Sequence, residues 1–154
     1  KENLVKLEHH LAREDSSSLV LKEVLGSING YDYMIIDCPP SLGILNQNAL
    51  SFGEEVFVPV ATDFLGYDAL TKMREIIEKI NTHYNHDIKL SKIIPTLFDR
   101  RNNICKQMLA KIQTNFPNLA SYPIRYNSKL KEAPMHGKSI FSYAKKCIGA
   151  QDYH

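Results

Sequence analysis

The sequence has few cysteines, no long apolar run and no low-complexity tract. Its three cysteines, Cys38, Cys105 and Cys147, are odd in number and widely spaced, which argues against a disulfide framework and a zinc knuckle. No apolar run approaches the roughly 18–20 residues of a membrane span. The 154 residues are 44% hydrophobic and 23% charged, as in globular proteins. We therefore expect a soluble intracellular protein, with residues 1–154 forming a single domain because no linker interrupts them.

The net charge of +2 hides an uneven distribution along the chain. Residues 1–87 hold 7 Lys/Arg and 14 Asp/Glu, whereas residues 88–154 hold 12 Lys/Arg and 3 Asp/Glu. A basic half of this kind suits an anionic partner such as nucleic acid, a nucleotide or a membrane surface. The alternative is that the two halves neutralise each other within the fold, and charge alone does not decide between these interpretations.

Short apolar segments alternate with amphipathic helical patterns. The spacing of apolar residues predicts a helix that follows residues 15–18 and stops at Gly30, strands at 33–38, 55–60, 92–97 and 122–124, and helices at 66–84 and 103–116. Continuous apolar strands are typical of a parallel sheet that is covered on both faces. Because strands and helices alternate, the pattern also predicts βαβ units. We expect an α/β fold in three layers, with a mostly parallel sheet between helices.

The carboxyl ends of the predicted strands are where the chemistry is expected, because ligands of open parallel sheets bind just beyond them. This rule selects residues 37–41, the turn after Val60, residues 96–101 and residues 125–131. Asp37 ends an apolar strand, from which its carboxylate can hold Mg²⁺, directly or through water, beside a triphosphate. The other interpretation is that Asp37 caps a helix or makes a buried hydrogen bond.

Longer motifs occur at the same places. They are Y-D-Y-M-I-I-D-C-P-P-S-L-G at 31–43, V-P-V at 58–60, T-L-F-D-R-R at 96–101, I-R-Y-N-S-K-L-K-E-A-P at 124–134 and G-A-Q-D-Y at 149–153. In order and spacing they resemble the ParA/Soj/MinD family of deviant Walker-type ATPases, which partition chromosomes and plasmids. The resemblance extends from about residue 19 to the end, and it is closest to the ParA/Soj branch.

The resemblance implies a P-loop NTPase-like fold in which ATP clamps two subunits into a homodimer and a ParB/Spo0J-like partner stimulates slow hydrolysis. In that scheme Asp37 is the Walker B acid, which acts in catalysis by holding Mg²⁺ through water. Pro39 and Pro40 belong to the switch that senses the γ-phosphate. ATP and Mg²⁺ are therefore the implied cofactors.

The resemblance also implies a base pocket. Thr96 and the backbone around Ile124, Arg125 and Tyr126 fall where the family holds the adenine ring. At the position of Arg125 the family usually has proline, so the pocket departs from the family pattern there.

DNA is the other implied partner, bound without sequence preference. Arg101 falls on a basic position that the Soj branch uses for DNA, and Lys129 falls on a second one, where arginine is usual. Both lie in the basic half of the chain. Lysine at position 129 can replace the usual arginine, because non-specific DNA binding requires only a positive charge that reaches a phosphate. The implied location is the cytoplasm of a bacterium or archaeon, in association with the nucleoid.

The family's glycine-rich phosphate loop is not found in this sequence, since no G-x-x-x-x-G-K-[ST] occurs. Residues 137–139 match only its last three letters, because Glu132 stands where the first glycine is needed. Without the loop and the strand before it, we expect this chain alone to bind ATP poorly and to be inactive. We also expect the natural protein to be longer, with this chain as its C-terminal part.

Three other interpretations remain. A phosphorelay receiver domain needs an acidic pair after an earlier strand, and the pair at residues 14–15 follows no apolar strand. A MinD-like ATPase needs a C-terminal amphipathic helix, for which residues 140–154 are too short and mixed, so we expect no stable membrane binding. The third is a ParA-like binding module without hydrolysis. A metal site at His83 and His86 is disfavoured because no cysteine lies near them.

Overall fold

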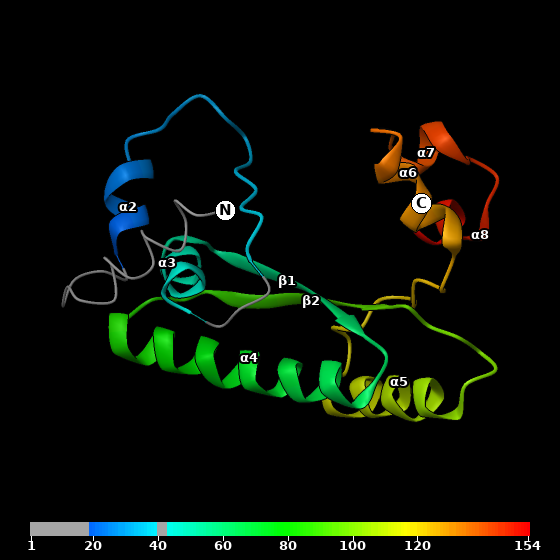
Figure 1. Cartoon of the computed structure of the whole chain (residues 1–154). Helices are drawn as coiled ribbons and strands as arrows, with labels where there is room; N and C mark the ends of the chain where they lie inside the picture. Colours follow the sequence, from blue (N-terminus) through cyan, green and yellow to red (C-terminus); the bar gives the residue numbers. More distant parts are fainter. Residues whose placement is uncertain (1–18, 40–42) are drawn as a thin grey trace. The chain divides into compact units, whose positions relative to one another are not determined.

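The computed structural model describes residues 19–39 and 43–154 (Figure 1). The predictions for Pro40 and for the start of the first helix lie outside the described residues. The elements are α2 (Val20–Leu25), α3 (Ile44–Phe52), β1 (Glu55–Ala61), α4 (Phe64–Tyr84), β2 (Lys89–Thr96), α5 (Asn103–Asn115), α6 (Ser128–Met135), α7 (Ile140–Tyr143) and α8 (Ile148–Asp152). None of the helices in these two ranges has both the length and the apolar character that crossing a membrane requires.

The chain divides into two compact units, which we describe separately. The first unit comprises Lys1–Val56 and Met73–Lys89, and the second unit comprises Phe57–Lys72 and Leu90–His154. Strands β1 and β2 and helix α4 therefore contribute residues to both units.

Asparagine side chains join the elements of the first unit. Asn48 in α3 accepts a hydrogen bond of 3.0 Å from the backbone N–H of Leu21 in α2. Asn81 in α4 donates to the carbonyl of Ile88 at 2.9 Å and accepts from its N–H at 3.0 Å. Because the side chain of Ile88 is buried, its backbone groups need partners inside the protein. Asn81 provides both of them and so fixes the turn between α4 and β2.

Strand β2 is hydrogen-bonded along both edges in the second unit. On one edge, beside β1, the carbonyl of Thr96 accepts from the N–H of Thr62 at 3.1 Å. On the other edge, Ile93 forms a parallel bridge with Ala120, and Phe98, just beyond the strand, forms one with Arg125. The predicted α/β fold with a parallel sheet is confirmed.

The hydrophobic core of the second unit lies between this sheet and two helices. It contains Val60 from β1, Leu70 from α4, Ile93 from β2, and Ile112 and Phe116 from α5 and its C-terminal cap. Figure 1 shows α4 and α5 along the same side of the two strands. The spacing of three to four residues between buried positions in α5 places their side chains on one face of the helix, as an amphipathic pattern predicts.

Helix α4 begins where only glycine fits. Asp63 accepts a hydrogen bond from the backbone N–H of Gly66 at 2.8 Å, which caps the helix. A Cβ atom at Gly66 would lie 2.2 Å from the carbonyl oxygen of Ala61 in β1. The absence of a side chain at Gly66 therefore allows the helix to start directly after the strand.

Residues 33–38, predicted as a strand, form none. The side chains of Tyr33 and Ile35 are 88% and 93% exposed. A strand exists through hydrogen bonds to a neighbouring strand, and no segment within residues 19–39 and 43–154 pairs with this one. Apolar composition alone was an insufficient basis for the prediction.

Two smaller predictions were also wrong. The segment 122–124 is flanked by single bridges at Ala120 and Arg125 and is not a strand, since Pro123 has no N–H to donate to a ladder. The first helix ends at Leu25 with Gly26 as its C-cap, before the predicted stop at Gly30. The predicted strands at 55–60 and 92–97 and the predicted helices at 66–84 and 103–116 lie within a few residues of β1, β2, α4 and α5, whereas α3, α6, α7 and α8 were not predicted.

Two leucines in α4 offer a matched test of the core. Leu70 is 0% exposed and Leu65 is 75% exposed. Leu70→Ala should lower the free energy of unfolding by about 2–5 kcal/mol, because it removes buried methyl groups and leaves a cavity. Leu65→Ala, with the same change in helix propensity, should cost less than about 1 kcal/mol. Urea denaturation of both variants measures the difference, and equal losses would contradict the described core.

Candidate functional site

Asp37 lies in a segment without regular secondary structure that precedes α3, in the first unit. Its side chain and that of Cys38 are both exposed. Partial desolvation and, in second place, the charge of Asp37 raise the pKa of the Cys38 thiol above its ordinary value. Cys38 is therefore a protonated thiol at neutral pH, not an activated nucleophile.

Asp37 supplies a single carboxylate for a metal ion. No group of three or more His, Cys, Asp or Glu side chains within residues 19–39 and 43–154 could enclose a metal. Mg²⁺ keeps several waters and is commonly held by one or two carboxylates together with substrate phosphates. The donor set therefore fits Mg²⁺ that arrives with a triphosphate.

Pro39 is tied to α3 by its backbone. The carbonyl of Pro39 accepts a hydrogen bond of 3.0 Å from Nδ2 of Asn46, a buried residue of α3. This bond fixes the residue that follows Asp37 and Cys38. The predicted partner of Pro39 in the switch, Pro40, lies outside the described residues.

Thr96 ends β2, and its polar groups are engaged with β1. Its hydroxyl donates to the carbonyl of Val60 at 3.2 Å. Its own carbonyl accepts from both the N–H and the hydroxyl of Thr62, at 3.1 and 3.2 Å. These reciprocal bonds fix the carboxyl end of the strand. Thr96 can therefore line a pocket through van der Waals contacts, but its hydroxyl cannot donate a hydrogen bond to a ligand while it donates to Val60.

The loop after β2 leaves the sheet through a left-handed residue, Leu97, whose φ is 55°. This conformation costs a residue with a side chain roughly 1–2 kcal/mol. Hydrogen bonds hold the loop beyond it: the N–H of Arg101 donates to Oδ1 of Asp99 at 2.9 Å, and the N–H of Asn102 donates to the Asp99 carbonyl at 3.1 Å. Asn102 then caps α5 by accepting from the N–H of Ile104. The loop between Leu97 and Asn102 is thus tied down by hydrogen bonds at its far end.

The guanidinium of Arg101 is paired side-on with Asp99. Nε donates to Oδ1 at 3.1 Å and Nη2 donates to Oδ2 at 3.0 Å. These side-chain hydrogen bonds lower the pKa of Asp99 and raise the pKa of Arg101. The Arg101 side chain is 89% exposed, so the pair is open to solvent and to dissolved ions.

Arg125 is bound to Asp152 of α8 through both backbone and side chain. Its N–H donates to Oδ2 at 2.9 Å, Nε lies within 3.1 Å of both carboxylate oxygens, and Nη2 donates to Oδ1 at 2.5 Å. The Asp152 side chain is 12% exposed. Hydrogen bonds from the Arg125 side chain lower the pKa of Asp152, and the charge of Arg100 makes a smaller contribution in the same direction. Arg125 thus anchors α8 to the segment that follows α5.

Ile124 and Tyr126 flank this anchor. Ile124 is buried; its N–H donates to the carbonyl of Pro95 at 2.7 Å, and its carbonyl accepts from the N–H of Phe98. Tyr126 donates its N–H to the carbonyl of Phe98 at 2.9 Å, and its ring is exposed. Nζ of Lys131 lies 4.9 Å from the centroid of the Tyr126 ring, which is a cation–π distance. Tyr126 therefore offers an accessible aromatic surface beside a positive charge.

Lys129 lies in the first turn of α6 and is paired with Glu132. Its Nζ donates to Oε2 of Glu132 at 2.7 Å, and the hydroxyl of Tyr143 donates to the same oxygen at 2.9 Å. The hydrogen bond from Lys129 and then that from Tyr143 lower the pKa of Glu132. The ring of Tyr143 in turn stacks on His136, with centroids 5.0 Å apart. Both cations predicted to bind DNA, Lys129 and Arg101, therefore carry an acidic partner within the chain.

A hollow of about 220 Å³ in the second unit collects part of the predicted site. Its lining residues are Phe98, Asp99, Arg100, Arg101, Arg125, Tyr126 and Ile148. It brings together Arg101, Arg125 and Tyr126, whereas Thr96, Ile124 and Lys129 do not line it. Asp99 and Arg100 belong to the T-L-F-D-R-R motif and could have been singled out from the sequence. Asp152 likewise belongs to the G-A-Q-D-Y motif, but nothing in the sequence indicated that it pairs with Arg125.

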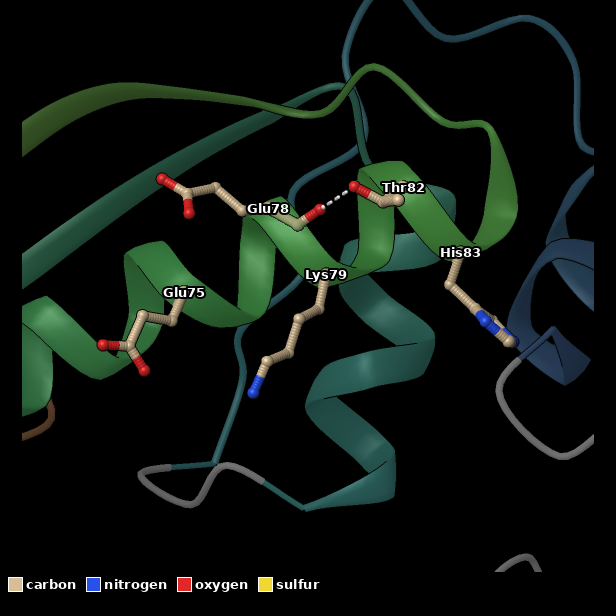
Figure 2. A pocket seen from close by; sticks show the side chains of 5 residues that line it. All are labelled: Glu75, Glu78, Lys79, Thr82 and His83. Carbon is tan, nitrogen blue, oxygen red and sulfur yellow. Dashed lines mark hydrogen bonds between the residues drawn. The ribbon is translucent and has the colours of Figure 1, made fainter.

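A larger hollow, of about 810 Å³, lies along α4 in the first unit (Figure 2). Its lining residues are Glu75, Glu78, Lys79, Thr82 and His83, all of them exposed. The Thr82 hydroxyl donates to the backbone carbonyl of Glu78, as the dashed line shows. His86 does not join His83 there, because its Nε2 is hydrogen-bonded to the carbonyl of Gly53 at 2.7 Å. This surface contains none of the predicted site residues.

Comparisons with known proteins connect these features to one family. The model of a family described as an AAA domain matches residues 1–90. The chromosome-partitioning ATPase Soj of Treponema pallidum is 34% identical to the chain over 145 residues, which cover 93% of the chain and 57% of that protein. The chromosome partitioning protein ParA of Caulobacter vibrioides is 33% identical over 155 residues, covering 98% of the chain and 58% of that protein. The chain thus spans less than two thirds of the length of these relatives.

Solved structures agree in fold. Cobyrinic acid a,c-diamide synthase from Mycobacterium smegmatis, with a bound ATP analogue and magnesium, superposes with a TM-score of 0.75 at 28% identity, over 98% of the chain and 56% of that protein. A variant of McdA from Cyanothece, in complex with ATP, superposes with a TM-score of 0.85 at 18% identity, over 98% of the chain and 60% of that protein. The second similarity supports the fold alone.

The Arg125–Asp152 pair predicts a loss of stability in acid. The pKa of Asp152 is lower in the folded chain than in the unfolded chain, where it is about 4. The pair therefore contributes fully to the free energy of unfolding above about pH 4, and this contribution is lost as the pH falls through the pKa of the folded state. The raised pKa of Arg125 has no effect in this range. Asp152→Asn should lower the melting temperature at pH 7 and flatten its fall below about pH 4.

The control for this prediction is Asp32→Asn, since Asp32 is an exposed carboxylate of the first unit. Some acid dependence should survive in the Asp152 variant, because the pKa values of Asp99 and Glu132 are lowered as well. Thermal denaturation followed by circular dichroism between pH 3 and pH 7 measures all three proteins. A melting profile of Asp152→Asn that is parallel to that of the natural chain would refute the assigned role of the pair.

Proposed function

This chain belongs to the ParA/Soj family of AAA domain proteins, and from that membership we propose that the whole protein is a partition ATPase. It binds ATP and Mg²⁺ as a homodimer, associates with DNA without sequence preference, and hydrolyses ATP slowly until a ParB/Spo0J-like partner stimulates it. Its cargo is a chromosome or a plasmid, and its place is on the nucleoid. The observation that carries the proposal is 33–34% identity to Soj and ParA over more than nine tenths of the chain.

In this proposal Asp37 is the carboxylate that holds Mg²⁺ through water. When bound, Mg²⁺ would neutralise charge on the phosphates of ATP while the γ-phosphoryl group is transferred to water. The exposed side chain of Asp37, and the bond that fixes neighbouring Pro39 to α3, are consistent with a carboxylate held ready for an incoming metal–nucleotide complex. Pro39 and Pro40 serve as the start of the switch.

The adenine base is proposed to lie beside the end of β2 and beside residues 124–126, which are hydrogen-bonded to the residues around that end. Tyr126 supplies an exposed ring, while Thr96 and Ile124 shape the pocket with side chains held by the sheet. Arg125 has its N–H and guanidinium engaged with Asp152, so it contributes by fixing the backbone and not by donating to the base.

DNA binding is proposed for the basic second half of the chain. Arg101 and Lys129 have side chains that are 89% and 48% exposed, and each could exchange its carboxylate partner for a phosphate. Exposed ion pairs are worth about 0–1 kcal/mol, so the exchange is inexpensive. Counterions released from DNA favour it, most strongly at low salt.

The Mg²⁺ role of Asp37 can be tested in the whole protein. Asp37→Asn should reduce ATP hydrolysis about 10- to 100-fold, as is common when a residue that orients a metal through water is lost. The exposed Asp32, in the same segment, provides the control Asp32→Asn, which should hydrolyse ATP normally. Phosphate release measured over a range of Mg²⁺ concentrations tests the assignment. An unchanged rate at every Mg²⁺ concentration would exclude Asp37 from the reaction.

The DNA role can be tested by reversing one charge. Arg101→Glu, in the whole protein with ATP and Mg²⁺, should weaken binding to a mixed-sequence duplex by about tenfold or more at 0.1 M salt, because a phosphate contact is replaced by repulsion. ATP binding should be unaffected. Lys106→Glu, an equal change at an exposed position in α5, should have a much smaller effect. Fluorescence anisotropy at two salt concentrations measures both, and equal effects would contradict a specific role for Arg101.

A further inference from the structure

Ile148, the first residue of α8, lines the 220 Å³ hollow but is not among the predicted site residues. It is 45% exposed although its side chain is apolar. Tyr126, which is 52% exposed, and the half-buried Phe98 line the same hollow. Accessible apolar surface in a hollow favours a ligand with apolar or aromatic surface of its own.

Contacts of α8 fix the position of Ile148. Ile148 and Asp152 are four residues apart in this helix, so their side chains lie on the same face. Asp152 accepts hydrogen bonds from the backbone N–H and the guanidinium of Arg125, and these bonds bring that face against residues that line the hollow. Gly149 lies close to Leu130 of α6 and provides a second point of attachment. Ile148 is thus held at the hollow before any ligand arrives, which lowers the entropic cost of binding.

The size and the chemistry of the hollow match a nucleobase. Pockets for complete small molecules usually enclose about 300–1,000 Å³, so a hollow of about 220 Å³ accommodates one part of a larger ligand. Tyr126 and Ile148 offer apolar contacts to the faces of a base. Hydrogen-bond donors and acceptors for its polar edge are present in the charged side chains that line the hollow, namely Asp99, Arg100 and Arg101. A phosphate group would leave the apolar surface unused.

We propose that Ile148 is a base-contacting residue of the nucleotide site and that α8 forms one wall of the adenine pocket. The inference rests on the proposed ATP binding, and it adds to that site a helix that neither the motifs nor the family pattern placed there. Contact between Ile148 and the base removes apolar surface of both from water, which favours binding. The Arg125–Asp152 pair gains a second role, because it holds this wall in place.

The first experiment measures the affinity of the whole protein for Mg²⁺–ADP by isothermal titration calorimetry. Ile148→Ala should weaken binding about fivefold, because the part of the side chain that remains exposed in the free protein no longer contacts the base. Ile104→Ala is the matched control, since Ile104 is 40% exposed, lies in the first turn of α5 and does not line the hollow. The control should bind ADP normally.

Two outcomes of this titration have different meanings. Equal affinities of the natural protein and Ile148→Ala would overturn the role of Ile148 and leave the proposed ATP binding intact. Failure of the natural protein to bind ADP would overturn the proposed function, and the inference with it.

Tripolyphosphate with Mg²⁺ separates the base from the phosphates, because it has no base. The natural protein and Ile148→Ala should bind tripolyphosphate with the same affinity. If Ile148→Ala weakened the binding of ADP and of tripolyphosphate equally, the substitution would be acting on the site as a whole, and contact with the base would be refuted.

A second experiment does not depend on truncating the side chain. The δ1 methyl resonances of isoleucine are followed by NMR in the whole protein while Mg²⁺–ADP is added. The ring current of the bound base should shift the resonance of Ile148, and Ile148→Val identifies that resonance because valine has no δ1 methyl group. Tripolyphosphate should not shift it, and the resonance of Ile104 should move with neither ligand. An Ile148 resonance that responds equally to both ligands, or to neither while ADP binds, would overturn the inference.

Discussion

The hydrogen bonds along both edges of β2 are the constraint on which the second unit depends. One edge is joined to β1 through Thr62 and Thr96, and the other to the segment around Ala120 and Arg125. A strand that is bonded on both sides cannot shift its register without breaking two sets of bonds. Phe98, at the start of the loop that carries Arg101, forms a bridge with Arg125, so the sheet brings these two segments side by side.

Charge pairing is the second organising feature. Arg101, Lys129 and Arg125 are each bound to a carboxylate, but the pairs differ in kind. The partners of Arg101 and Lys129 lie two and three residues away in sequence and are half-buried, each with a side chain that is 35% exposed. The partner of Arg125 lies 27 residues away and is 12% exposed. Exposed local pairs open at little cost, which suits groups that bind and release a polyanion, whereas the shielded pair suits a structural tie.

Sequence patterns predicted the elements whose cause is local. Apolar spacing placed α4 and α5 within two residues of their ends because burial of one face determines such helices. The strand predicted at 33–38 failed because a strand depends on a partner that composition does not reveal. At the site, motif order and spacing singled out Arg101, Arg125 and Tyr126 as candidates, and these three residues line one hollow. The partners of the arginines could not be predicted equally well: Asp99 is local to its arginine, but the pairing of Arg125 with Asp152 follows from the path of the chain through three helices.

The distance in sequence between Arg125 and Asp152 has a consequence for how the chain folds. The pair closes a loop of 27 residues that contains α6, α7 and α8, three helices of 8, 4 and 5 residues. Helices of this length are not stable in isolation. They persist because the closed loop lets them pack on one another, for example through Leu130 against Gly149, where a Cβ atom would meet the leucine at 2.7 Å. We therefore expect these helices to order together, as one cooperative unit, when the ion pair forms, with the entropy of loop closure lost in the same step.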